Sequence, residues 1–212
     1  MESKNELTVQ AHAVAIEYPK YGLYKSKEGP NGDSINQATW SVYNHLTQKK
    51  GVKPKQIIIF GRSMGSGPAT FLAHRTNNQA AALILFSPYQ SIRDVSKEHA
   101  GCFGNFVPNY FDNKSLIPQI TIPTFIIHGQ RDEVISHENG KRLFELSGSK
   151  QKQFANPPQM THNRFELRPD FITPATQFLG EVQVLPSVDP GKVPIFDPIQ
   201  INNINARDAK RF

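Results

Sequence analysis

One stretch of the chain decides the predicted fold: Gln56-Ile57-Ile58-Ile59-Phe60-Gly61-Arg62-Ser63-Met64-Gly65-Ser66-Gly67. Its first five residues form a short β-branched run without alternation, which is typical of a strand buried on both faces. The small residues that follow predict a sharp turn into a helix over residues 65–75. Such a turn lifts the Ser63 hydroxyl clear of the sheet and places it beside the amino end of that helix.

This position makes Ser63 a candidate nucleophile. The pattern G-x-S-x-G is common by chance, but a preceding buried strand and a following helix are the context in which the serine acts chemically. The helix amino terminus directs amides towards developing negative charge, and the amide of Met64 is the expected oxyanion donor. The alternative interpretation is a tight turn with a purely structural role.

A serine at its ordinary pKa is a weak nucleophile and requires a base that is oriented by an acid. In this type of site the order along the chain is serine, acid, histidine. Asp132 and Glu133 are the two candidate acids, because both lie just beyond the apolar run that ends at His128. His162 is the candidate base, since its loop precedes the last expected helix. His128 ends a strand, and we interpret it as a packing and hydrogen-bonding residue.

The remainder of the chain alternates between expected strands and expected helices. This pattern predicts an α/β fold with a mostly parallel sheet of about five strands flanked by helices on both faces. Asp33 or Ser34 is expected to cap the first helix, and Gly51 to end it. The other expected strands are residues 13–18, 81–86, 124–129 and, more weakly, 152–154, and the later expected helices are residues 138–146 and 164–179.

Residues 1–180 are expected to form one domain, with an irregular excursion over residues 89–122. That excursion is too long for a plain connection, and we interpret it as a cap or a substrate-binding segment. Its aromatic residues either line an acyl groove or pack within the cap; they are Phe103, Phe106, Tyr110 and Phe111. Residues 181–212 contain recurrent prolines and are expected to be an extended tail, either a floppy terminus or a strap that docks on another protein.

Composition excludes several classes of protein. No apolar window is long enough to span a membrane, and the polar first residues, Met1 to Glu6, resemble neither a signal nor a transit peptide. The single cysteine, Cys102, cannot form an intrachain disulfide, so we expect an intracellular, most simply cytoplasmic, protein without a structural zinc site. The net charge of +6 is scattered, and no aromatic-interleaved basic stripe predicts a nucleic-acid partner.

Residues 13–179 resemble the α/β-hydrolase superfamily, specifically the small-capped branch that includes protein depalmitoylases (acyl-protein thioesterases) and related esterases. The matching segments are Glu17-Tyr18-Pro19-Lys20-Tyr21-Gly22, Gly61 to Ala69, Phe86-Ser87-Pro88, Pro123 to Gly129 and the loop ending in His162-Asn163. The resemblance implies a serine hydrolase of esters or thioesters, and the depalmitoylase branch implies a fatty-acyl thioester on a protein as the substrate. It implies Ser63 as nucleophile, Asp132 as acid and His162 as base, and no cofactor or metal.

One part of the family pattern is missing. Relatives carry an earlier strand and a His-Gly-Asn-type loop that supplies a second oxyanion amide; a lesser departure is Thr161, where relatives usually have glycine. The missing strand normally lies between residues 13–18 and 56–60, so its absence predicts either direct pairing of these two segments or an unpaired edge. Loss of one oxyanion donor typically costs about 100- to 1000-fold in rate.

Three explanations for the missing strand are a fragment, a second polypeptide that donates the strand and loop, and a degenerate hydrolase. The alternative function is therefore a catalytically weak or inactive subunit with a structural role in a larger assembly. We expect such a subunit to contact its protein partner through residues 181–212 and the N-terminal edge of the sheet.

Overall fold

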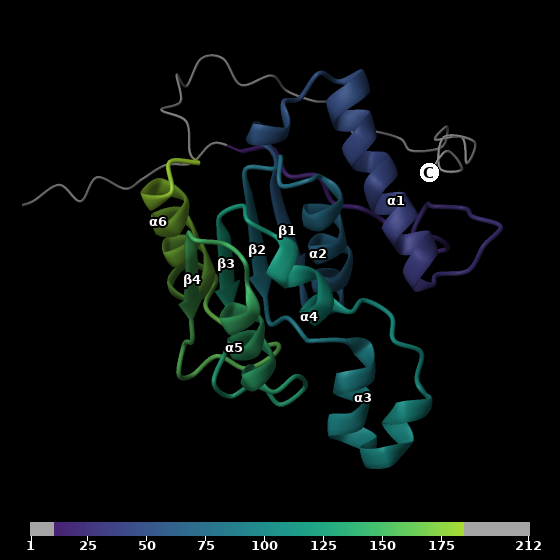
Figure 1. The fold of residues 1–212 in the computed structure, drawn as a ribbon, viewed down its shortest axis with the longest axis vertical. Coiled ribbons are helices and arrows are strands. Elements are labelled where there is room, and N and C mark those ends of the chain that lie inside the picture. The colour runs from purple at the N-terminus through teal and green to yellow at the C-terminus, as the bar shows by residue number, and fades with distance from the viewer. Residues whose placement is uncertain (1–10, 185–212) are drawn as a thin grey trace, which may run out of the picture.

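The computed structural model describes residues 11–184, which fold around a parallel four-stranded sheet (Figure 1). The strands follow the order of the sequence across the sheet: β1 (Ile58–Arg62), β2 (Ala82–Phe86), β3 (Thr124–Ile127) and β4 (Lys152–Ala155). In this register Gly61 lies opposite Leu85, and Phe86 lies opposite Ile127. The expected α/β class with a parallel sheet is confirmed, with four strands rather than about five.

Helical segments make every connection between the strands. The α-helices are α1 (Gly32–Asn44), α2 (Ser66–Arg75), α3 (Ile92–Ala100), α4 (Asn113–Leu116), α5 (His137–Leu146) and α6 (Thr173–Glu181). The 3-10 and π turns are η1 (His45–Lys49), η2 (Pro54–Gln56), η3 (Ser63–Gly65), η4 (Gly101–Phe106), η5 (Ile117–Gln119) and η6 (Leu167–Ile172).

The sheet lies between two layers of helices because its side chains alternate between two cores. Leu83 and Leu85 of β2 point into a core shared with α1, α2 and α5. Ile84 and Phe86, on the opposite face, join a core that includes Phe178 of α6. Complete burial of such a side chain stabilises the fold by about 1.5–3 kcal/mol, so both layers fix the sheet that carries the candidate site.

Residues 13–18 do not form the strand that was expected there. Most of this segment is exposed, and no strand among the described residues pairs with it. An apolar run forms a strand only where a neighbour accepts its hydrogen bonds, and β1 is the edge of the sheet instead. The expectation of a strand buried on both faces is also wrong for β1, because Phe60 at this edge is 49% exposed.

The start of α1 differs from the expectation as well. Asn31 caps the helix: its side-chain oxygen accepts a hydrogen bond from the Ser34 amide at 2.8 Å, and Ser34 Oγ accepts one from the Asn31 amide at 3.0 Å. This reciprocal capping box satisfies two amides at once, so Ser34 is its second member rather than the cap. Asp33 lies in the first turn, where its charge favours the helix dipole.

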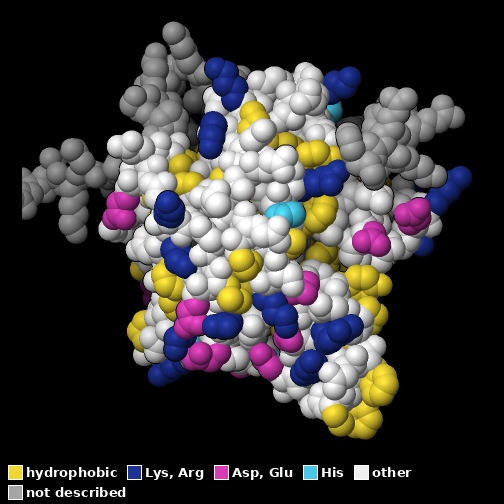
Figure 2. Space-filling view, in the orientation of Figure 1, with side chains coloured by type: hydrophobic (Ala, Val, Ile, Leu, Met, Phe, Trp, Pro, Cys, Tyr) yellow, Lys and Arg dark blue, Asp and Glu magenta, His cyan; other side chains and the backbone are white. Residues whose placement is uncertain are grey.

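Residues 89–122 are largely helical, which corrects the expectation of an irregular excursion. α3 and η4 pack on each other and project from the sheet (Figure 1). The projecting segment formed by α3 and η4 carries exposed hydrophobic side chains at its tip (Figure 2), with Phe103 73% and Phe106 86% exposed. Phe111 instead lies so close to Gly67 of α2 that a side chain on Gly67 would collide with it. The aromatic residues of the segment therefore do not line one common groove.

The end of the described chain is formed by η6 and α6. Pro174 lies in the first turn of α6, where proline is tolerated because that amide has no helical acceptor. α6 ends at Glu181, and the proline-rich tail expected over residues 181–212 lies almost entirely outside the described residues. Among residues 11–184, no helix combines the length and the apolar character needed to cross a membrane.

Candidate active site

Ser63 lies on a strained turn between β1 and α2. Its φ of 51° is in the left-handed region, which residues other than glycine seldom adopt. Gly61 is required for this turn, because a Cβ there would lie 2.4 Å from the Gly65 carbonyl oxygen and 2.5 Å from Ala69 Cβ. Gly65 has more room, since a Cβ at that position would lie 3.6 Å from the Tyr18 hydroxyl. The turn therefore places Ser63 at the carboxyl end of β1.

The three residues predicted as a triad are in contact. Ser63 Oγ lies 2.9 Å from His162 Nε2, and His162 Nδ1 lies 2.8 Å from Asp132 Oδ2. The Asp132 side chain is fully buried and the His162 side chain is 7% exposed. When Nδ1–H donates to the carboxylate, Nε2 is left to accept the hydroxyl proton, which is the arrangement that serine activation requires. The catalytic roles of these residues remain predictions.

The Asp132 carboxylate accepts hydrogen bonds from several directions. Besides His162, its donors are the amides of Val134 and Ile135 at 3.0 and 2.8 Å, and His128 Nε2 lies 3.3 Å from it. Burial by itself would raise the pKa of Asp132, but the hydrogen bonds from His128, Ile135, His162 and Val134 hold that pKa well below its usual range. The carboxylate is therefore ionised at neutral pH.

Glu133, the alternative acid, does not contact the imidazole through its carboxylate. Its Oε2 lies 3.3 Å from the backbone nitrogen of His162. Arg62 approaches the same residue from the other side, and its Nη2 donates to the His162 carbonyl oxygen at 2.6 Å. Sequence reasoning gave no role to Arg62, because 100 residues separate it from His162 and no local pattern signals the contact.

The predicted oxyanion donor, the Met64 amide, belongs to the η3 turn. Tyr89 Oη donates to the Met64 carbonyl oxygen at 3.1 Å and so ties this turn to the segment after β2. Burial, together with nearby Tyr18, raises the pKa of Tyr89, which keeps its hydroxyl protonated as a donor. Within residues 11–184 no strand lies beyond β1, so the described chain contains no loop in the place from which relatives supply a second amide.

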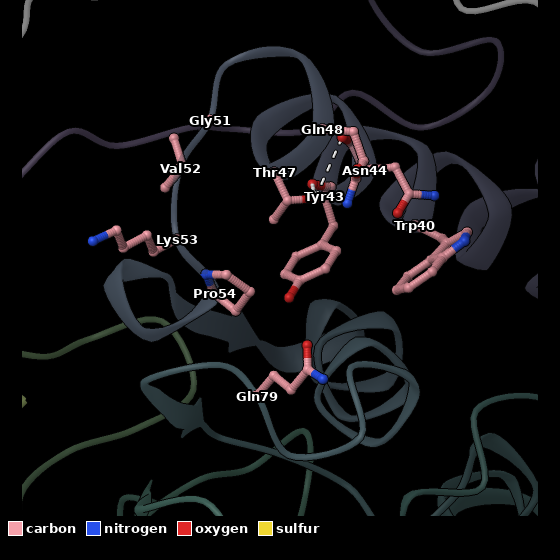
Figure 3. Close-up of a pocket in the computed structure, with 10 residues that line it drawn as sticks. All are labelled: Trp40, Tyr43, Asn44, Thr47, Gln48, Gly51, Val52, Lys53, Pro54 and Gln79. Carbon is pink, nitrogen blue, oxygen red and sulfur yellow. Dashed lines mark hydrogen bonds between the residues drawn. The ribbon is translucent and has the colours of Figure 1, made fainter.

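Elsewhere the described chain contains a surface pocket but no group of metal-ligating side chains. Between residues 11 and 184 no three histidine, cysteine, aspartate or glutamate side chains are grouped to hold a metal ion, and Cys102 is exposed. A surface pocket of about 420 Å³ lies at the opposite end of the sheet, among residues that precede β1 and β2 (Figure 3). Its lining residues are Trp40, Tyr43, Asn44, Thr47, Gln48, Gly51, Val52, Lys53, Pro54 and Gln79.

Known proteins resemble this chain in both sequence and fold. The model of a family described as "Serine aminopeptidase, S33" matches residues 112–166, a segment that contains Asp132 and His162. Human alpha/beta hydrolase domain-containing protein 17B is 32% identical over 142 residues, which are 65% of this chain and 46% of that protein. This chain has the α/β-hydrolase fold. The resemblance read from the sequence is thereby confirmed.

Further relatives agree with this assignment. The putative alpha/beta hydrolase L404 of Acanthamoeba polyphaga mimivirus is 32% identical over 153 residues, covering 71% of this α/β-hydrolase and 55% of the viral protein. The chain thus spans about half the length of the curated relatives it matches.

Solved structures confirm the fold. Est1E from Butyrivibrio proteoclasticus matches with a TM-score of 0.59 at 14% identity, over 72% of this chain and 71% of Est1E. Acetyl xylan esterase 1 from Thermoanaerobacterium matches with a TM-score of 0.55 at 19% identity, over 70% and 52% of the two chains. This α/β-hydrolase therefore has the fold of known esterases.

Proposed function

We propose that this α/β-hydrolase cleaves an ester or a thioester, with Ser63 as nucleophile, His162 as base and Asp132 as the orienting acid. The observation that carries the proposal is the unbroken contact from Ser63 Oγ to His162 Nε2 and from His162 Nδ1 to Asp132 Oδ2. Three residues far apart in the chain meet in the order that acyl transfer needs, at the carboxyl ends of β1, β3 and β4.

The proposed reaction has two halves. His162 Nε2 takes the Ser63 hydroxyl proton while Oγ bonds to the substrate carbonyl carbon, and the resulting oxyanion faces the Met64 amide. The bond from that carbon to the leaving oxygen or sulfur then breaks, and His162 gives its proton to the leaving group. A water molecule attacks the acyl-Ser63 ester with His162 again as base, which releases the acid and restores the serine.

A fatty-acyl thioester on a protein is the substrate that we propose within this class. Support comes from the resemblance to the depalmitoylase branch and from the uncharged stretch over residues 100–111. This stretch belongs to the connection that leaves the sheet at the carboxyl end of β2, and it exposes Phe103 and Phe106. The name of the matched acetyl xylan esterase also favours an ester over the peptide suggested by the family description.

A second candidate function is a weakly active or inactive subunit that binds another protein. One observation favours it: among residues 11–184 no strand pairs with the outer side of β1, and these residues offer one expected oxyanion amide rather than two. An unpaired edge strand can pair with a strand of another chain.

Labelling by a fluorophosphonate probe separates the two candidates. We expect the purified 212-residue chain to be labelled at Ser63, and Ser63→Ala to remain unlabelled while keeping the circular dichroism spectrum of the wild type. Acyl esters and acyl thioesters of increasing chain length would then define the substrate. A folded wild-type chain that takes no label would overturn the proposed activity and favour the binding subunit.

A further inference from the structure

Arg62 connects the turn that carries Ser63 to the loop that carries His162. It is the last residue of β1, and its Nη2 donates to the His162 carbonyl oxygen at 2.6 Å and to Asn163 Oδ1 at 3.1 Å. The guanidinium carbon also lies 5.7 Å from the centre of the Phe165 ring. A planar guanidinium can make these contacts together, because its several N–H groups point in fixed directions.

Glu133 contacts the backbone amide of His162. Its Oε2 lies 3.3 Å from the His162 nitrogen, so the amide and the carbonyl of His162 are each engaged by a charged side chain. Arg62 adjoins Ser63 in the sequence, and Glu133 adjoins Asp132. Arg62 and Glu133, the sequence neighbours of Ser63 and Asp132, therefore both bind the backbone of His162.

We infer that Arg62 and Glu133 are positioning residues that fix the main chain of His162 and thereby align its imidazole between Ser63 and Asp132. His162 lies in a bend outside the helices and strands, so regular structure does not hold its backbone. Asp132 and Ser63 orient the ring, but a loop that shifts by about 1 Å can cost roughly 100-fold in rate. This role rests on the proposed function, since it concerns the same serine, histidine and aspartate.

The two contacts are expected to contribute unequally. Both hydrogen bonds are charge-assisted, but the Arg62 contact is the shorter one, at 2.6 Å against 3.3 Å. Glu133 is also exposed to solvent, whereas Arg62 is partly buried. Loss of the guanidinium should therefore misalign His162 more than loss of the glutamate.

The first test is the second-order rate constant for fluorophosphonate labelling. We expect Arg62→Gln to slow labelling by about 10- to 100-fold, and Glu133→Ala to slow it less. Glu133→Gln keeps an acceptor oxygen and should recover most of the wild-type rate. Ethylguanidine should partly rescue Arg62→Ala, because it restores a charged N–H donor for the His162 carbonyl oxygen. Arg142→Gln, which removes an exposed arginine paired with Glu145, is the matched control and should label normally.

The second test needs no activity. The proton between His162 Nδ1 and Asp132 should give a downfield NMR resonance that is identified by its loss in Asp132→Asn. We expect this resonance to broaden or vanish in Arg62→Gln and to persist in Arg142→Gln, at a temperature where both chains are folded. An unchanged resonance in Arg62→Gln, or its absence from the wild type, would overturn the inference. An ordered resonance in a wild-type chain that takes no probe would instead refute only the proposed activity.

Discussion

The hydroxyl of Tyr89 lies 3.1 Å from the carbonyl oxygen of Met64 and anchors the turn that carries Ser63. Tyr89→Phe should lower the free energy of unfolding by about 1 kcal/mol, because this part-buried hydrogen bond is lost. Tyr43→Phe is the matched control, since within residues 11–184 the buried Tyr43 hydroxyl has no hydrogen-bond partner. Urea denaturation should show that loss of this second hydroxyl is neutral or stabilising. Equal losses for the two variants would contradict the assigned contact.

The left-handed backbone of Ser63 predicts an unusual order of stability. Ser63→Gly and Ser63→Ala both remove the hydrogen bond to His162, but only glycine tolerates a φ of 51° without strain. The glycine variant should therefore be the more stable of the two by about 1 kcal/mol in thermal or urea unfolding, although neither should react with the probe. At Ser96, inside α3, the order should reverse, because alanine favours a helix. An alanine variant of Ser63 that is the more stable would show that the turn is not strained.

Gly61 is predicted to be intolerant of any side chain. Gly61→Ala would place its Cβ against the Gly65 backbone and should destabilise the chain by about 2 kcal/mol or more, with loss of labelling at Ser63. Gly180→Ala in α6 is the comparison, because nothing lies within 4 Å of the added carbon. That variant should be stabilised by up to about 1 kcal/mol, as measured by the urea midpoint. A neutral Gly61→Ala would mean that β1 and α2 are less closely apposed.

The low pKa of Asp132 predicts a pH-dependent stability. The folded-state pKa lies below the value in the unfolded chain, about 3.9, so the ionised group stabilises the fold above that pH. This contribution is lost as the pH falls through the folded-state pKa. Asp132→Asn should therefore be less stable than the wild type by about 1–3 kcal/mol at pH 7, and the gap should narrow towards pH 3.

Urea unfolding at both pH values measures this gap. Asp33→Asn, on the exposed first turn of α1, should change the stability by less than about 1 kcal/mol at either pH. A gap for Asp132→Asn that stays constant with pH would contradict a preferential stabilisation of the ionised carboxylate.

Sequence reasoning predicted the strands and the turn that depend only on residues close together in the chain. β2 is buried along its whole length and β3 likewise, and such uninterrupted apolar runs are readable without knowing their neighbours. The turn at Ser63 was readable because its glycines are needed within a few residues of the serine. The order of Ser63, Asp132 and His162 along the chain allowed the candidate site to be assembled, and the structure brings the three side chains together.

What escaped prediction depends on contacts between distant segments or on choices between equivalent residues. Residues 13–18 have the composition of a strand, but pairing is decided by whether a neighbour is present. Asn31, Asp33 and Ser34 are all good helix caps, and only the geometry of the turn selects Asn31. The contact of Arg62 with His162 spans 100 residues and has no sequence signature.

The open edge of β1 has a consequence for the order in which the candidate site and the core unfold. Amides on the outer side of this strand face no partner strand within the described part of the chain, so they should exchange with deuterium faster than the amides of β2 and β3. Ser63 follows directly from β1, whereas His162 is attached through β4 at the far side of the sheet. Fraying of the edge would thus separate the serine from its base while the central strands remain folded. In a urea titration, labelling at Ser63 should decline at a lower concentration than the one that unfolds the core.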